Sequence, residues 1–122
     1  MQARLTLKIT IKIDGRNLVM NNKRCPSHPG ILLKEDVLPA MNLTKSRAAE
    51  LLGVSRAYLY RLLDGEVPMS VEMCLKIGKL AGNGGRLWWN MQAAYNLWQA
   101  EHDPEIRKIV KRVPSYKELE SA

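Results

Sequence analysis

Two short helical segments separated by about three residues constrain this chain more than any other feature of its sequence. Apolar residues recur at helical spacing over Thr44–Leu52 and again over Ser55–Leu63. We expect Gly53 to end the first segment in a left-handed conformation and the Ser55 hydroxyl to cap the second. Because the connection is so short, the sequence predicts two helices that meet at a sharp angle.

Small and apolar residues mark the sides of these two helices that face inward. Alanines at positions 48 and 49 would let the two helix backbones cross closely, because their side chains are short. The predicted inner residues are Ala48, Ala49, Leu52, Val54, Leu59 and Leu62. The residues left facing outward on the second helix are Arg56, Ala57, Tyr60 and Arg61.

Three further helices complete a mainly α-helical domain. The pattern predicts a short helix over Ile31–Leu38 that ends near Pro39, another over Ser70–Ala81 and the longest over Arg86–Glu101. A glycine-rich cluster, Gly82–Gly85, separates the last two. The sequence therefore predicts a five-helix domain over residues 21–102.

The two ends of the chain differ from this domain. Apolar and polar residues alternate over Arg4–Ile13, and Asp14-Gly15 follows as a turn signal, so residues 1–20 are predicted to form a β-strand or hairpin extension. The segment either adds a strand to the sheet edge of a partner, or is translated upstream of a true start at Met20. Residues 103–122 are predicted to be a tail with one or two helical turns before Pro114 and a loosely helical end.

The outward residues of the second helix would have a use in the major groove of DNA. The Arg56 guanidinium is placed to pair with guanine, and Ala57 can pack on a thymine methyl group. Tyr60 and Arg61 lie one turn later and can reach bases or phosphates. Residues at the helix N-termini are placed for phosphates, namely Thr44, Lys45 and Ser55.

The overall charge agrees with a polyanionic partner, although the pattern alone leaves a plainer interpretation open. Lys and Arg outnumber Asp and Glu by 19 to 12, a formal net charge of +7 over 122 residues. Ordinary helical domains also pack short helices through small residues, and an exposed arginine is usually only solvated.

The longest predicted helix carries a broad aromatic stripe. Its members recur at spacings of three and four and are Leu87, Trp88, Met91, Tyr95 and Trp98. In a domain this small, the inner sides of the other four helices are expected to pack against one another and to leave little room for the aromatic stripe. We therefore assign the stripe to a two-fold dimer interface, with core packing as the alternative. Such a dimer would hold two recognition helices about 34 Å apart and read a palindromic operator.

Three motifs in order resemble one family. Leu51–Gly65 resembles the Cro/repressor (XRE) class of helix-turn-helix domains, which have the five-helix, lambda-repressor-like fold. His28–Pro39 looks like the opening helix of HigA-type antitoxins, and Leu87–Leu97 looks like their fifth helix. The resemblance spans about His28 to Glu101 and implies a homodimer that represses its own operon and neutralises an mRNA-cleaving toxin of the HigB type. A stand-alone helix-turn-helix repressor without a toxin is the alternative.

Two positions depart from the pattern of that class. Lys45 stands where the class commonly has Gln, so a fixed hydrogen bond to phosphate would become a point-charge contact that salt screens. Gly82–Gly85 replaces a stiffer turn and is expected to loosen the junction with the last helix.

The sequence gives little support for metal binding, catalysis or membrane association. Cys25 and Cys74 stand far apart without metal-ligand spacing, and neither His28 nor His102 has a recognisable catalytic neighbour. We therefore expect no enzyme activity, no cofactor and no metal, with a nuclease as the alternative among enzymes. No apolar run is long enough to span a membrane and no signal peptide is evident, so we expect a cytoplasmic protein with no membrane partner.

Overall fold

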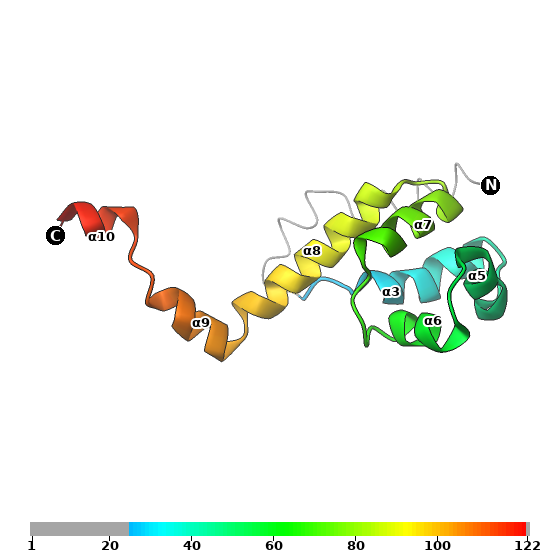
Figure 1. Cartoon of the computed structure of the whole chain (residues 1–122), viewed down its shortest axis with the longest axis horizontal. Helices are drawn as coiled ribbons and strands as arrows, with labels where there is room; N and C mark the ends of the chain where they lie inside the picture. Colours follow the sequence, from blue (N-terminus) through cyan, green and yellow to red (C-terminus); the bar gives the residue numbers. More distant parts are fainter. Residues whose placement is uncertain (1–24, 122) are drawn as a thin grey trace.

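The computed structural model describes residues 25–121, and these are mainly helical, with non-helical chain at 25–28 and in the segments that connect the helices. The predicted strand or hairpin over residues 1–20 lies outside the described residues. Five helical elements form the domain, and two more continue as an arm (Figure 1). The expectation of a mainly α, five-helix domain is confirmed.

The first helical element is longer than predicted. It consists of three consecutive segments, α3 (Pro29–Leu32), the π-helical η1 (Leu33–Val37) and α4 (Leu38–Ala40). It ends at Ala40, one residue after Pro39, so the expected end near Pro39 is confirmed, although the proline itself lies inside the helix. Within η1 the Leu38 N–H donates to the carbonyl of Leu33, five residues back, and the wider turn lets the helix continue through a proline, which has no N–H to donate.

The next four helices begin and end close to the predicted positions. They are α5 (Lys45–Leu52), α6 (Arg56–Leu63), α7 (Val71–Ala81) and α8 (Gly85–Glu101). The hydroxyls of Thr44, Ser55 and Ser70 each accept a hydrogen bond from a backbone N–H in the first turn of the helix that follows. Gly53 ends α5 at φ 70°, in the predicted left-handed conformation.

The core lies between the first element and the four helices that follow. Its fully buried members include Leu33 from η1, Leu59 and Leu62 from α6, Ile77 from α7 and Trp88 from α8. The inner residues predicted on α5 are also buried, namely Ala48, Ala49 and Leu52, whereas Val54 is partly buried against the core.

The junction between α7 and α8 is packed closely at Gly78. A Cβ on Gly78 would collide with the backbone of Gly84 and Gly85, so the absence of a side chain lets the two helices approach. The Trp88 Nε1–H also donates to Asn83 Oδ1 in this turn, at 2.9 Å. Gly78, Gly84 and Gly85 therefore permit close contact between the two helices, and the expected loosening by Gly82–Gly85 stays a prediction.

A buried histidine fixes the start of the first helix. His28 Nδ1 accepts a hydrogen bond from the Gly30 N–H, and His28 Nε2 therefore carries the proton and donates to the Val67 carbonyl, both at 2.9 Å. The ring also meets the edge of Tyr95, with ring centroids 5.1 Å apart. Burial lowers the pKa of His28 below its usual value, and the hydrogen bond to Val67 opposes that shift.

This histidine predicts that the domain loses stability in mild acid. Because the pKa of His28 is lower in the folded chain, the unfolded chain takes up a proton first as the pH falls. The contribution of neutral His28 is therefore complete above about pH 6.5 and is lost progressively as the pH falls toward the lowered value. Urea unfolding at pH 7.5 and 5.5 measures the loss of stability. The same loss should be seen in His102→Gln, the control that removes the other histidine of the chain. A free energy of unfolding that stays level over this range would contradict it.

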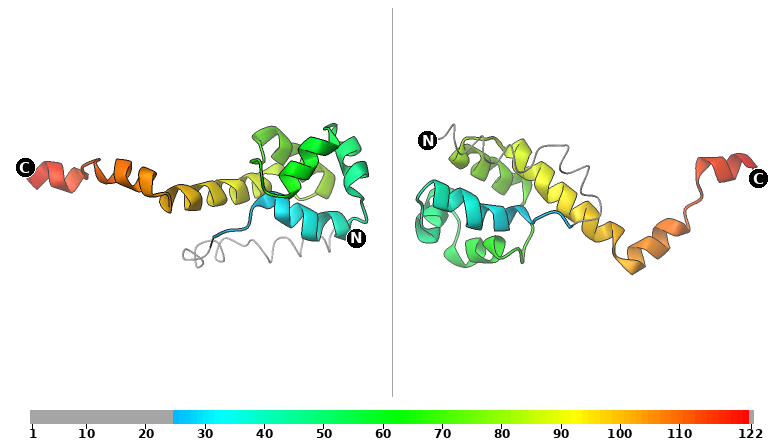
Figure 2. Two further views of the ribbon diagram at one scale, coloured as in Figure 1. Left: turned by 90° about the horizontal axis from the view of Figure 1, so that it is seen from below. Right: turned by 180° about the vertical axis from the view of Figure 1, so that it is seen from behind.

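Beyond α8 the chain forms an arm that leaves the domain. It contains α9 (Pro104–Lys111) and α10 (Tyr116–Ser121), neither of which has a buried residue. Figures 1 and 2 show both helices projecting from the far end of α8. The predicted helical turns before Pro114 are confirmed, and the end of the chain forms a defined short helix, capped by Ser115 and Glu118.

Candidate nucleic-acid interface

The short connection between α5 and α6 holds the two helices against each other. The Val54 N–H donates to the Ala49 carbonyl at 3.0 Å, directly across the turn. Leu59 and Leu62 are fully buried and anchor α6 from beneath. The opposite side of α6 is consequently left to solvent.

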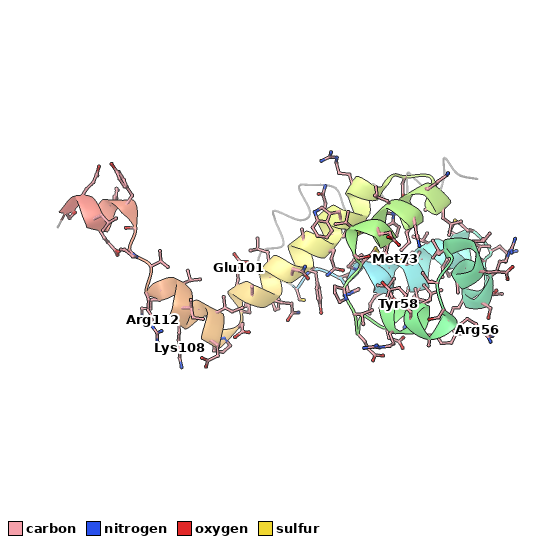
Figure 3. All side chains as sticks on the ribbon, in the orientation of Figure 1. Arg56, Tyr58, Met73, Glu101, Lys108 and Arg112 are labelled. Atoms are coloured by element: carbon pink, nitrogen blue, oxygen red, sulfur yellow. The ribbon has the colours of Figure 1, made fainter. Side chains whose placement is uncertain are left out.

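All four residues predicted to face outward on α6 are exposed. They are Arg56, Ala57, Tyr60 and Arg61, and Figure 3 shows Arg56 at the edge of the molecule. Glu50 is the only acid between positions 44 and 63, and its carboxylate pairs with Arg47 at 2.7 Å. The surface of α5 and α6 is therefore predominantly cationic.

The two predicted hydroxyl contacts are exposed and keep a hydrogen to donate. Thr44 Oγ1 accepts from the Arg47 N–H, and Ser55 Oγ accepts from the Tyr58 N–H, both at 3.1 Å. In each case the hydroxyl serves as an acceptor, so its own O–H remains available to a phosphate oxygen.

A contact between the two helices was missed by sequence reasoning. The Lys45 ammonium, in the first turn of α5, lies 5.4 Å from the centroid of the Tyr60 ring on α6. Fifteen positions separate these residues in the chain, and no local pattern pairs them. The signal that could have found them is the crossing of the two helices, which brings the start of α5 beside the middle of α6.

The predicted dimer interface on α8 is buried in part within one chain. Trp88 and Met91 are buried in the core of a single chain, so assigning them to a dimer interface is wrong. Leu87 packs against the same core. Tyr95 contacts His28, and Trp98 stacks on His102 with ring centroids 3.8 Å apart. Trp88 and Met91 are covered within one chain because the first helical element and α7 both reach α8, whereas Leu87, Tyr95 and Trp98 stay partly exposed.

The described residues give little support for a metal site, a reactive thiol or a membrane-spanning helix. Over positions 25–121, no three His, Cys, Asp or Glu side chains gather where they could hold a metal ion. Burial raises the pKa of the Cys74 thiol to about 11, which keeps it protonated near neutral pH. In the same part of the chain, no helix has the length and apolar character needed to cross a membrane.

An exposed cationic second helix, set at a three-residue turn against a first helix whose inner side is buried, defines the helix-turn-helix class. The comparisons with known proteins narrow this class. The chain is 33% identical over 101 residues to antitoxin HigA-1 of Vibrio cholerae, covering 82% of this chain and 93% of that protein. The chain belongs to the HigA antitoxin family.

Other relatives and solved structures agree in fold. The helix-turn-helix transcriptional regulator YbaQ of Escherichia coli K12 is 28% identical over 95 residues, 78% of this chain and 84% of that protein. A HigA-family addiction module antidote protein of Coxiella burnetii has a TM-score of 0.67 at 26% identity, covering 76% of this chain and all of that one. Pseudomonas aeruginosa antitoxin HigA, solved with the higBA promoter, has a TM-score of 0.68 at 22% identity and covers 75% of this chain and 98% of that one. No family model matches the sequence.

Proposed function

We propose that this protein is a sequence-specific DNA-binding antitoxin that represses its own operon and neutralises an mRNA-cleaving toxin of the HigB type. The observation that carries the DNA-binding part is the exposure of Arg56, Ala57, Tyr60 and Arg61 on α6, above buried Leu59 and Leu62. The Pseudomonas aeruginosa antitoxin HigA, which has this fold, was solved with the higBA promoter.

In the proposed complex α6 enters the major groove. Arg56 pairs with the O6 and N7 atoms of guanine, and Ala57 packs on a thymine methyl group. Tyr60 and Arg61 follow one turn later along the groove or its phosphates. Thr44, Lys45 and Ser55 hold the helix in register by contacts to phosphate.

The protein acts as a homodimer in this proposal. Two copies related by a two-fold axis would place two α6 helices about 34 Å apart, on one face of the duplex. The operator is therefore palindromic, with half-sites about one helical turn apart. Operon DNA and messenger RNA are both cytoplasmic in a bacterium, which is where this function would be exercised.

The roles assigned to Arg56 and Lys45 predict different binding defects. Arg56→Ala should weaken specific binding by about 1–3 kcal/mol and relax the preference at one base position. Lys45→Ala should weaken binding to all duplexes alike and reduce the slope of log K against log salt by about 1. Fluorescence anisotropy with the operator and single-base variants, at several salt concentrations, measures both.

Arg86→Ala is the matched control for these variants. Arg86 is an exposed arginine at the start of α8, away from α5 and α6 in the chain, so its removal should change neither quantity by a comparable amount. Wild type and both variants binding every duplex equally would overturn the assigned roles.

The toxin partner separates this proposal from a stand-alone repressor, the alternative suggested by relatives such as YbaQ, which is described as a helix-turn-helix transcriptional regulator. The test is co-expression with the small reading frame next to the gene. An antitoxin should co-purify with that product and rescue cells that it poisons. If the product of that reading frame does not bind the protein while operator binding is intact, the protein is a stand-alone repressor and not an antitoxin.

A further inference from the structure

The first helix of the arm has an apolar side with no cover inside the chain. Ile106, Ile109, Val110 and Val113 recur at spacings of three and four, so they lie on one side of α9 and its C-terminal end. All are exposed, Ile109 at 59%, Val110 at 62% and Val113 at 68%. We call these four residues the α9 face.

The α9 face continues onto the end of α8. A groove lies at the elbow between the two helices, and it is lined by Leu97 and Ala100 of α8 and by Ile106 and Val110 of α9. The elbow is held by Asp103, whose carboxylate caps α9 by accepting from the Glu105 and Ile106 N–H groups. A helix of eight residues is only marginally stable alone in water, so an α9 that persists needs a cover for this side.

Charge is divided along the same stretch of chain. Acidic residues come first, Glu101, Asp103 and Glu105, and basic residues follow, Arg107, Lys108, Lys111 and Arg112. Figure 3 shows Glu101 at the α8 side of the elbow and Arg112 at the far end of α9. Lys108 pairs with Glu105 at 3.7 Å, but both side chains remain largely exposed. The two ends of the arm helix thus carry opposite charge.

A helix with an acidic beginning, a basic end and one apolar side is complementary to itself when two copies run in opposite directions. We propose that the α9 face binds the α9 face of a second copy of this chain, antiparallel and about a two-fold axis. The acidic end of each arm then meets the basic end of the other, and the four apolar residues of each are covered. A parallel pair would bring like charges together.

This inference goes beyond the proposed function by naming the surface that holds the homodimer, and it rests on that function only for its biological role. It also differs from the interface predicted on α8, of which the core buries Trp88 and Met91. Dimerisation is measured without DNA. A chain that does not dimerise but still binds an operator half-site can therefore be distinguished from one that dimerises but does not bind DNA.

The test is a charge exchange between two variants. Glu101→Lys/Glu105→Lys makes the acidic end of the arm basic, with Asp103 left as the one acid among these seven charged residues, and Lys111→Glu/Arg112→Glu makes the basic end acidic, with Arg107 and Lys108 left as the only bases among them. Each variant alone should dimerise at least about 10-fold more weakly than wild type in low salt, by sedimentation equilibrium. Mixed in equal amounts they should recover a heterodimer, which a variant that had merely unfolded could not do.

Two further measurements fix the surface and the orientation. Ile109→Asp should abolish dimerisation, whereas Leu75→Asp, at an exposed leucine on α7, should leave it unchanged. In a Cys25→Ser background, Glu105→Cys mixed with Arg112→Cys should form a heterodimeric disulfide that neither variant forms with itself. A monomeric wild type, a dimer insensitive to Ile109→Asp and the charge variants, or cross-linking of Glu105→Cys to itself would each overturn the proposal.

Discussion

Trp88→Ala is expected to lower the free energy of unfolding by about 3–5 kcal/mol. The Trp88 side chain is fully buried where α8 packs on the rest of the core, and its indole N–H donates to Asn83 Oδ1. Truncation would leave a cavity and a partly buried amide oxygen without its donor. Because a domain of this size has a total stability of about 5–15 kcal/mol, this one change removes a large share of it. Urea denaturation followed by circular dichroism measures the loss.

The next residue provides a matched control. Trp89 is the same residue type on the same turn of α8, but 41% of it is exposed. Trp89→Ala should cost less than about 1.5 kcal/mol, since only part of its surface leaves water on folding. Similar costs for the two variants would mean that α8 does not present Trp88 to the core as described, and would reopen the assignment of the aromatic stripe to a dimer interface.

Gly30→Ala is expected to destabilise the domain by about 3 kcal/mol and to weaken operator binding as well. A Cβ at this position would collide with the backbone carbonyl of Leu62, in the last turn of α6. A backbone carbonyl cannot rotate away as a side chain can, so the first helix and α6 must separate. Because α6 carries the proposed contacts to bases, this movement should also change its orientation in the groove. Denaturation and operator titration of the same preparation measure both effects.

Gly53 provides the comparison for that variant. It lies at φ 70° in the turn between α5 and α6, and a Cβ there would meet nothing within 4 Å. Asparagine tolerates the left-handed conformation, so Gly53→Asn should cost under about 1 kcal/mol. If Gly30→Ala proved as mild as Gly53→Asn, the close approach of the first helix to α6 would not be needed for the fold.

The sequence alone determined the helices, their caps and the exposed side of α6. These features depend on local chemistry: a hydroxyl before a first turn, a glycine after a last one, and apolar residues at helical spacing. Thr44, Ser55, Ser70 and Gly53 all occupy the predicted caps, and Leu59 and Leu62 are buried as expected. The continuation of the first helix through Pro39 was not evident, because it depends on a change of hydrogen-bond register in η1.

The tertiary structure decided which apolar side remained uncovered. Periodicity shows that α8 and α9 each have an apolar side, but it does not show what packs on them. The close approach of α7 at Gly78 and the contact of His28 with Tyr95 cover α8, whereas α9 extends beyond the reach of the other helices. The Lys45–Tyr60 contact has the same origin, since distances between residues far apart in the chain are set by how helices cross. Burial of an amphipathic helix is a property of its neighbours, and only their arrangement in space supplies it.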